Sequence, residues 1–301
     1  MERCTLNANG FEGIYFHGTH SPETAVIAVG GASCDEKLSV AMSRFIREAG
    51  YNVLVLGFYM WKGLPTELVS VPVDYVEKAV RWLRSEKGIK KIAMTGASTG
   101  AGYTLLAASF IPEIGCVIPV VPFDHVMEGT TNSFKRLHRS VYTWHGTDIP
   151  YSPWTIIDSG MGKIVAEAVK DSRYGLKRLY RYGYDINPLT EQSRIRVENM
   201  HADVLFLAVK NDDAWPSDIA VPRMTEILKK YNYPYRVKYH IYSRASHALT
   251  DGLDAMSGYA KWAYRYLLPA EKKYPAECEA ARKDSFRRIL DFIEQWDNKR
   301  G

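Results

Sequence analysis

One stretch decides the fold: Lys91-Ile-Ala-Met-Thr-Gly-Ala-Ser-Thr-Gly-Ala-Gly102. An apolar run typical of a buried strand leads into Gly96-Ala-Ser-Thr-Gly100, and residues 103–110 have the composition of a helix. A serine on a tight turn between a strand and a helix exposes its hydroxyl at the end of the sheet. The two glycines lack a Cβ, so the strand and the helix can approach closely around the serine. The pattern predicts a nucleophile at Ser98, and the alternative is a plain glycine-rich turn.

Length and composition are those of an ordinary globular protein. The chain has 301 residues, of which 46% are hydrophobic and 24% charged, enough for a sizeable core. The net charge of +5 is spread along the chain and forms no tail. Nucleic-acid binding is therefore not required, although a local basic pocket for an anionic substrate is compatible with this charge.

The sequence also predicts a compartment. The N-terminus has no apolar signal-peptide core, and no apolar run approaches the roughly 18 residues of a membrane span. The four cysteines show neither a C-x-x-C pair nor metal-ligand spacing. We therefore expect a cytoplasmic protein with reduced thiols and no contact with a membrane.

Strands and helices alternate along most of the chain. An N-terminal hairpin is expected over residues 1–20, with Asn9-Gly10 as its turn. The expected strands are residues 24–29, 51–56, 89–95, 114–121, 204–209 and 236–241. The expected helices are residues 38–49, 73–87, 103–110, 217–231, 253–267 and 276–296. This alternation predicts one α/β domain over 1–301, with a mostly parallel central sheet and helices on both faces.

The alternation stops between residues 122 and 201. This segment is irregular, basic and aromatic, and its place in the chain suits a lid or cap over the site. Its basic cluster, Lys135-Arg-Leu-His-Arg139, could contact an anionic group such as a CoA phosphate, and its aromatic residues could line an acyl pocket. The alternatives are a solvated face and the segment's own core. The candidate substrate contacts are Lys135, Arg136, Tyr142 and Trp144.

A serine nucleophile needs a base, and the base needs a carboxylate that orients it. In sheets of this type the acid and then the histidine follow the serine in the chain, each beyond a strand end. His247 follows the strand expected at 236–241, and Asp212 follows the strand expected at 204–209. Asp212 is preferred as the acid because it lies at a common distance along the chain from the end of the strand. Asp213 is the alternative.

An oxyanion needs two backbone donors. The N–H of Thr99 is one candidate, and the N–H of Ala32, in the loop after the strand expected at 24–29, is the other. Cys34 lies in the same loop but lacks the strand–turn–helix context of a nucleophile, so it is interpreted as a small apolar residue. The remaining histidines have no carboxylate or cysteine at metal-ligand spacing. We therefore expect no metal and no cofactor.

These residues resemble the C-terminal catalytic domain of the bile-acid-CoA:amino-acid N-acyltransferase and acyl-CoA thioesterase family, an α/β hydrolase. The resemblance covers most of the chain after about residue 24. It implies an α/β-hydrolase fold and places the acid on Asp212 and the base on His247. The matching segments are Val71-Pro-Val-Asp-Tyr-Val-Glu-Lys-Ala-Val-Arg-Trp-Leu83, Gly96-Ala-Ser-Thr-Gly100, Ile195-Arg-Val-Glu198, Ala202-Asp-Val-Leu-Phe-Leu207, Asp212-Asp-Ala-Trp-Pro-Ser217 and Ser246-His247.

The chain also departs from that family's pattern. Members usually carry an N-terminal β-sandwich domain, whereas this chain has only the short hairpin region before Thr24. The turn of many members reads G-x-S-K-G-G, and here Thr99 stands at the lysine position. The members that transfer acyl groups use a cysteine nucleophile, so Ser98 implies hydrolysis.

The sequence therefore predicts a serine hydrolase that cleaves a small-molecule thioester, such as an acyl-CoA, or a carboxylic ester. The expected mechanism is an acyl-enzyme formed by a catalytic triad of Ser98, Asp212 and His247. Two alternatives remain open: a carboxylesterase for small or aromatic esters without CoA recognition, and a hydrolase-fold binding protein without activity.

Overall fold

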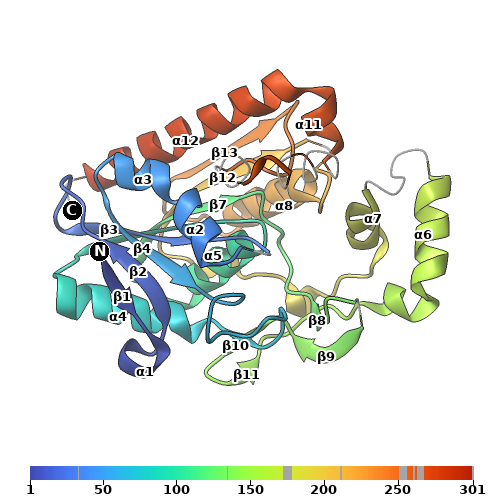
Figure 1. Ribbon diagram of the computed structural model, residues 1–301, viewed down its shortest axis with the longest axis horizontal. Helices are drawn as coiled ribbons and strands as arrows, with labels where there is room; N and C mark the ends of the chain where they lie inside the picture. The colour runs from blue at the N-terminus through green and yellow to red at the C-terminus, as the bar shows by residue number, and fades with distance from the viewer. Residues whose placement is uncertain are drawn as a thin grey trace.

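A parallel sheet lies at the centre of the protein (Figure 1). The computed structural model describes residues 1–32, 34–133, 135–171, 178–210, 212–250, 256–259, 262 and 268–299. Within these residues the main sheet has eight strands in the order β1-β2-β4-β3-β6-β7-β12-β13, parallel from β4 to β13 and antiparallel at β1 and β2. The strands are β1 Glu2–Cys4, β2 Glu12–Phe16, β3 Thr24–Val29, β4 Asn52–Gly57, β6 Lys91–Ala97, β7 Ile114–Val120, β12 Asp203–Val209 and β13 Val237–Tyr242.

Helices cover both faces of this sheet, which confirms the expected α/β architecture. Successive side chains of a strand point to opposite faces, and β3 illustrates the result. Its Ile27 packs in one apolar cluster with α4 (Asp74–Lys87), α5 (Thr99–Phe110) and α8 (Ser217–Lys230). Its Val26 packs in a second cluster, on the opposite face. The helices on that face are α2 (Glu36–Met42), α3 (Arg44–Glu48) and α12 (Pro275–Asp297).

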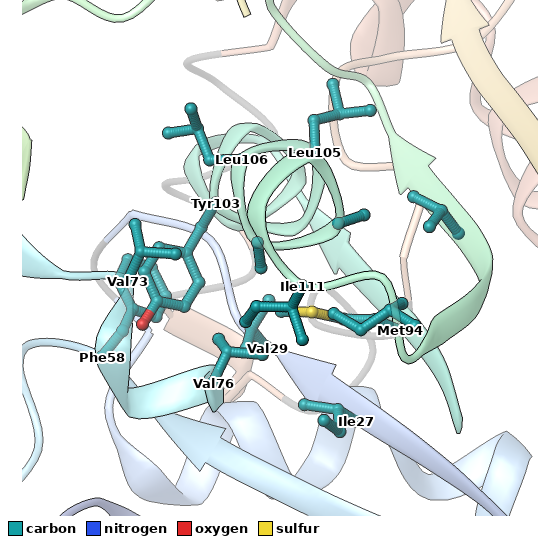
Figure 2. Close-up of a cluster of buried hydrophobic side chains, with 14 of the residues drawn as sticks. Ile27, Val29, Phe58, Val73, Val76, Met94, Tyr103, Leu105, Leu106 and Ile111 are labelled. Atoms are coloured by element: carbon teal, nitrogen blue, oxygen red, sulfur yellow. The ribbon is translucent and has the colours of Figure 1, made fainter. Parts of the chain in front are cut away.

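Helix α5 is buried along almost its whole length, because its sequence is apolar on every side. Figure 2 shows Leu105 and Leu106 pointing away from Tyr103, so that side chains of the cluster surround the helix. The ring of Tyr103 stacks on Phe58 at 4.9 Å, and its hydroxyl donates a hydrogen bond to the carbonyl of Pro72 at 2.7 Å. This packing fixes the N-terminal end of α5, where Ser98 lies.

The N-terminal turn differs from the prediction. Strands β1 and β2 pair antiparallel, but a short helix, α1 (Leu6–Asn9), connects them. Gly10 ends α1 in the left-handed conformation, with φ of 77°. The Asn-Gly pair thus ends a helix and does not form a two-residue hairpin turn. Glycine suits the left-handed conformation of such a helix C-cap.

Two helix predictions need correction or restriction, and a third is confirmed. The helix expected at 38–49 is interrupted at Ser43, so that α2 and α3 take its place. The helix expected at 253–267 falls mostly outside the described residues. The last one is present as α12, preceded by the short helix α11 (Pro269–Lys273). Among the described helices, none has the length and apolar character to cross a membrane.

The segment 122–201, called the insert below, has more regular structure than expected. In Figure 1 its helices α6 (Met161–Lys170) and α7 (Leu179–Ile186) lie to one side of the main sheet. Strand β10 pairs with β11 and with β5 (Val71–Pro72) from outside the insert, and β8 pairs with β9. These strands are too short to give a periodic sequence pattern. They are β8 Glu128–Thr130, β9 Arg136–Ser140, β10 Tyr142–Trp144 and β11 Thr147–Asp148, beside the 3₁₀ turns at Thr155–Ser159, Glu191–Ser193 and Val197–Asn199.

Candidate active site

Three side chains that follow three parallel strands meet at one edge of the sheet. Ser98 follows β6, Asp212 follows β12 and His247 follows β13. The imidazole Nδ1 of His247 lies 2.7 Å from Asp212 Oδ1, and its Nε2 lies 2.9 Å from Ser98 Oγ. A carboxylate only accepts hydrogen bonds, so the proton belongs on Nδ1 and Nε2 is left to accept the proton of the serine hydroxyl. This is the hydrogen-bond chain that a serine nucleophile requires.

The backbone of Ser98 is strained, with φ of 56° and ψ of −122°. A non-glycine residue in such a conformation costs about 1–3 kcal/mol, and the surrounding structure must enforce it. The flanking glycines allow this. A Cβ on Gly96 would lie 2.4 Å from the carbonyl oxygen of Gly100, and one on Gly100 would lie 2.0 Å from that of Gly30. The strand, the turn and the helix can therefore come together only with glycine at these positions.

The acid next to His247 is Asp212, and Asp213 points elsewhere. The Asp212 side chain is fully buried and accepts hydrogen bonds from the Ser217 hydroxyl at 2.6 Å and the Ala214 N–H at 3.0 Å. Asp213 instead accepts a hydrogen bond from Arg178 at 3.1 Å. Burial raises the pKa of Asp213, an effect that the charge of Arg178 opposes.

The insert contacts the loop that carries the acid. Arg181, on α7, donates hydrogen bonds to the main-chain carbonyl of Asp212 at 3.1 Å and to the carboxylate of Asp218 at 3.0 Å. Its Nε donates to Asp185, one turn further along α7, at 2.8 Å. Helix α7 is therefore attached to the acid loop by a buried arginine.

Aromatic side chains adjoin the imidazole. The ring of Trp215 meets that of His247 edge to face at 5.8 Å, and its indole N–H donates to the carbonyl of Val121 at 2.8 Å. Tyr184 of α7 contacts the same indole at 5.5 Å. This aromatic wall shields one side of His247 from water.

Of the two candidate oxyanion donors, Thr99 is the next residue after Ser98, and Ala32 follows Gly31, whose backbone passes beside Ser98. Thr99 is the first residue of α5, where the N–H groups have no acceptor within the helix. Gly31 passes beside the serine, since a Cβ on Gly31 would lie 3.3 Å from the Cβ of Ser98. Its own N–H donates to the sulfur of Cys34 at 3.2 Å, so the N–H of the exposed Ala32 is the next donor in that loop.

The thiol of Cys34 is a poor candidate for a nucleophile. It is nearly buried, and burial raises the pKa of its thiol to about 11. The thiol therefore stays protonated near neutral pH, and only the thiolate is a strong nucleophile.

Three of the four expected substrate contacts are engaged elsewhere. Arg136 forms ion pairs with the buried Glu128 at 2.8 Å and with Asp158. Tyr142 is buried and donates a hydrogen bond from its hydroxyl to the carbonyl of Thr99 at 2.9 Å, so it supports α5 and does not line an open pocket. Burial also raises the pKa of this phenol.

Trp144 lies at the wrong end of α5. It stacks on Phe110 at 4.8 Å, and Phe110 is the last residue of a 12-residue helix that starts next to Ser98. A helix of that length measures about 18 Å, so Trp144 does not reach the nucleophile. Lys135 is exposed.

One group of side chains in the described residues has metal-ligand spacing. The ligand atoms of Asp74, Glu77 and His145 lie within 4.8 Å of one another. The main-chain N–H of His145 donates a hydrogen bond to Asp74 at 3.0 Å, and its ring Nε2 lies 3.3 Å from Glu77. Asp74 and Glu77, on α4, are half-buried, and His145, directly after β10, is exposed.

The sequence prediction missed three residues around the triad. Ser217 and Trp215 belong to the Asp-x-x-Trp-Pro-Ser segment, so their nearness to the acid was a possible signal. Arg181 had none, because it comes from the insert and contacts a backbone carbonyl.

Comparison with known proteins gives the same family as the sequence motifs. The family model described as BAAT / Acyl-CoA thioester hydrolase C terminal matches residues 71–251, more than half of the chain. Mouse acyl-coenzyme A thioesterase 1 is 25% identical over 209 residues, which cover 68% of this chain and 43% of that protein. Mouse peroxisomal succinyl-coenzyme A thioesterase is 31% identical over 172 residues, which cover 56% of this chain and 36% of that protein. The chain thus spans less than half the length of these relatives.

Solved structures share the fold. A puromycin-hydrolyzing peptidase from Mycobacterium tuberculosis superposes with a TM-score of 0.56 at 14% identity, covering 96% of this chain and 38% of that chain. At that identity the likeness concerns the fold alone. The sheet order, the helices on both faces and the turn after β6 make this an α/β-hydrolase fold. Together with the family match over 71–251, they show that the chain belongs to the BAAT / acyl-CoA thioester hydrolase C-terminal family.

Proposed function

We propose that this chain hydrolyses a thioester or a carboxylic ester through an acyl-enzyme intermediate on Ser98. The observation that carries the proposal is the unbroken hydrogen-bond chain from Asp212 through His247 to Ser98, at 2.7 and 2.9 Å. Membership of a thioester hydrolase family supports the same reaction class.

In the acylation half, the hydroxyl of Ser98 attacks the carbonyl carbon of the substrate while Nε2 of His247 takes the hydroxyl proton. Asp212 holds the imidazole by Nδ1–H and stabilises the imidazolium that forms. The N–H groups of Thr99 and Ala32 donate to the oxyanion, each contributing on the order of 3 kcal/mol. The tetrahedral intermediate then expels the thiolate or alkoxide, which receives the proton from Nε2.

In the deacylation half, a water molecule takes the place of the leaving group. Nε2 of His247 removes a proton from this water, whose oxygen attacks the acyl carbon. Collapse of the second tetrahedral intermediate breaks the bond to Ser98 Oγ, which regains its proton from the imidazolium. The products are a carboxylic acid and a thiol or an alcohol, and this chemistry needs no cofactor.

A thioester is the first choice of substrate because the curated relatives are named acyl-CoA thioesterases. Lys135 is the member of the basic cluster that we retain as a candidate contact to an anionic group, since its side chain is exposed. The ion pairs of Arg136 and of Arg139, which pairs with Asp148 at 2.7 Å, favour the alternative of a carboxylesterase without CoA recognition. A binding protein without activity would have no need of the strained backbone at Ser98.

The test compares acyl-CoAs of several chain lengths with matched p-nitrophenyl esters, using the wild type and Ser98→Ala in parallel. A fluorophosphonate probe should label the wild type and leave Ser98→Ala unlabelled. Turnover of acyl-CoAs supports the thioesterase, and turnover of the simple esters alone supports the carboxylesterase. Hydrolysis retained in Ser98→Ala would contradict the mechanism, and a wild type inert to the probe and to all substrates would contradict the proposed function.

A further inference from the structure

The base of the triad lies on a loop, and its position must therefore be fixed by contacts outside the sheet. His247 follows β13 by several residues and keeps two hydrogen bonds in opposite directions. A shift of about 1 Å in a reacting group can cost about 100-fold in rate. Whatever holds the backbone around His247 thus acts on the reaction through the imidazole.

The preceding residue, Ser246, holds the backbone on both sides of His247. Its hydroxyl donates a hydrogen bond to Glu271 Oε1 at 2.5 Å and accepts one from the N–H of Ala248 at 3.2 Å. Ser246 is 1% exposed, so water does not replace these partners. One buried hydroxyl therefore ties the residues before and after the base to a single carboxylate.

That carboxylate is held in turn by α12. Glu271, on α11, accepts a hydrogen bond from Arg282 at 2.5 Å through the same oxygen that binds Ser246. The two side chains are 0% and 3% exposed. The second oxygen of Glu271 is buried and has no hydrogen-bond partner among the described residues.

A buried ion pair with an unsatisfied oxygen is a poor source of stability. Desolvation offsets most of its Coulomb attraction, and apolar residues of similar volume often stabilise a protein as well or better. The ion pair does provide what apolar packing cannot, because the carboxylate of Glu271 is a fixed hydrogen-bond acceptor for the Ser246 hydroxyl. Its geometry is that of a positioning device.

We propose that Ser246 and Glu271 are positioning residues for His247, with Arg282 fixing the carboxylate of Glu271. They hold the loop so that the imidazole reaches Ser98 and Asp212 together. This inference rests on the proposed function for its kinetic readout and on the triad geometry alone for its spectroscopic one.

The test variant is Ser246→Ala, which removes the hydroxyl and leaves the pair of Glu271 and Arg282 intact. We expect kcat to fall about 10- to 100-fold with KM changed less than about two-fold, because the substrate still binds while the base is displaced. Ser246→Thr restores the hydroxyl and should recover most of kcat.

The matched control is Ser285→Ala. Ser285, on α12, is also fully buried. Its hydroxyl lies 2.7 Å from the carbonyl of Arg282, one turn earlier on α12, and 3.0 Å from the carbonyl of Leu249, in the same loop but beyond the base. Its loss should lower the melting temperature and leave kcat within about two-fold, as for a contact that serves stability only. Equal effects of Ser246→Ala and Ser285→Ala on kcat would overturn the proposal.

A second readout separates this inference from the proposed function. The Nδ1–H proton of a histidine bonded to a carboxylate gives a strongly deshielded proton resonance. We expect this resonance in the wild type and in Ser285→Ala, and its loss or displacement in Ser246→Ala. An unchanged resonance in Ser246→Ala would overturn the positioning role even if the wild type proved inert to every substrate. A wild type that reacts with the fluorophosphonate probe beside a fully active Ser246→Ala would refute the inference and leave the proposed function standing.

Discussion

Two regions of the molecule meet at the triad and hold their side chains by different means. The loops that directly follow β6 and β12, called the strand-end loops here, inherit their positions from the sheet, and β12 is buried at every residue. The insert has strands of two to five residues and depends on ion pairs such as Arg136 with Glu128 and Arg181 with Asp218. The contrast teaches that the sheet places the chemistry, while polar contacts attach the insert to it.

The largest effect is expected in the strand-end loops. Ser98→Ala should reduce kcat by at least about 10⁴-fold, because no other group can form the acyl-enzyme. The control is Ser109→Ala on the same helix, whose hydroxyl only donates to the carbonyl of Leu106. Steady-state kinetics on the best substrate measure both. Comparable losses in the two variants would mean that the helix, and not the nucleophile, had been damaged.

The two adjacent aspartates offer the next comparison. Asp212→Asn should reduce kcat by about 10⁴-fold, since an amide no longer holds the correct tautomer of His247. Asp213→Asn should reduce it less than about 10-fold, because that side chain faces Arg178 and not the imidazole. The same kinetic assay compares them, and the reverse order would assign the acid to Asp213.

A third prediction concerns the link between the two regions. Arg181→Met removes the donor to the Asp212 carbonyl and should lower kcat by about 10-fold while destabilising the fold by about 3–5 kcal/mol. Arg194→Met is the control, since Arg194 is an insert arginine with the same 10% exposure that pairs with Glu198. Arg194→Met should lower the free energy of unfolding and leave kcat unchanged. If the two variants have equal kcat at a temperature where both are folded, the insert does not influence the acid.

The smallest effect is expected where the insert supports the nucleophile helix. Tyr142→Phe removes one buried hydrogen bond, to the carbonyl of Thr99, at a cost of about 1 kcal/mol in the free energy of unfolding. Denaturant titration measures this loss. A Tyr142→Phe protein with unchanged stability but lost activity would instead give the phenol a direct part in the reaction.

The sequence was informative where long apolar strands lead into short loops. The strand before Ser98 and the strand before Asp212 are visible as apolar runs. The alternation with helices predicted a mostly parallel sheet, which the structure confirms. The proximity of Ser98, Asp212 and His247 then follows from topology, because the carboxyl ends of parallel strands share one edge of a sheet.

Other features depend on tertiary contacts that leave no local pattern. The short strands of the insert form by pairing with distant partners, as Tyr142 of β10 does with Val71 of β5. The basic cluster looked available because its partner Glu128 lies eight residues away on another strand. Asn9-Gly10 suits both a hairpin turn and a helix C-cap, and only the packing around α1 decides between them.

The backbone of Ser98 also has a consequence for the stability of the fold. At φ of 56° and ψ of −122°, glycine would be relaxed where serine is strained, so Ser98→Gly should stabilise the fold by a share of the about 1–3 kcal/mol of strain. Serine at this position therefore gives up part of that stability, and in return its hydroxyl lies within hydrogen-bond distance of His247.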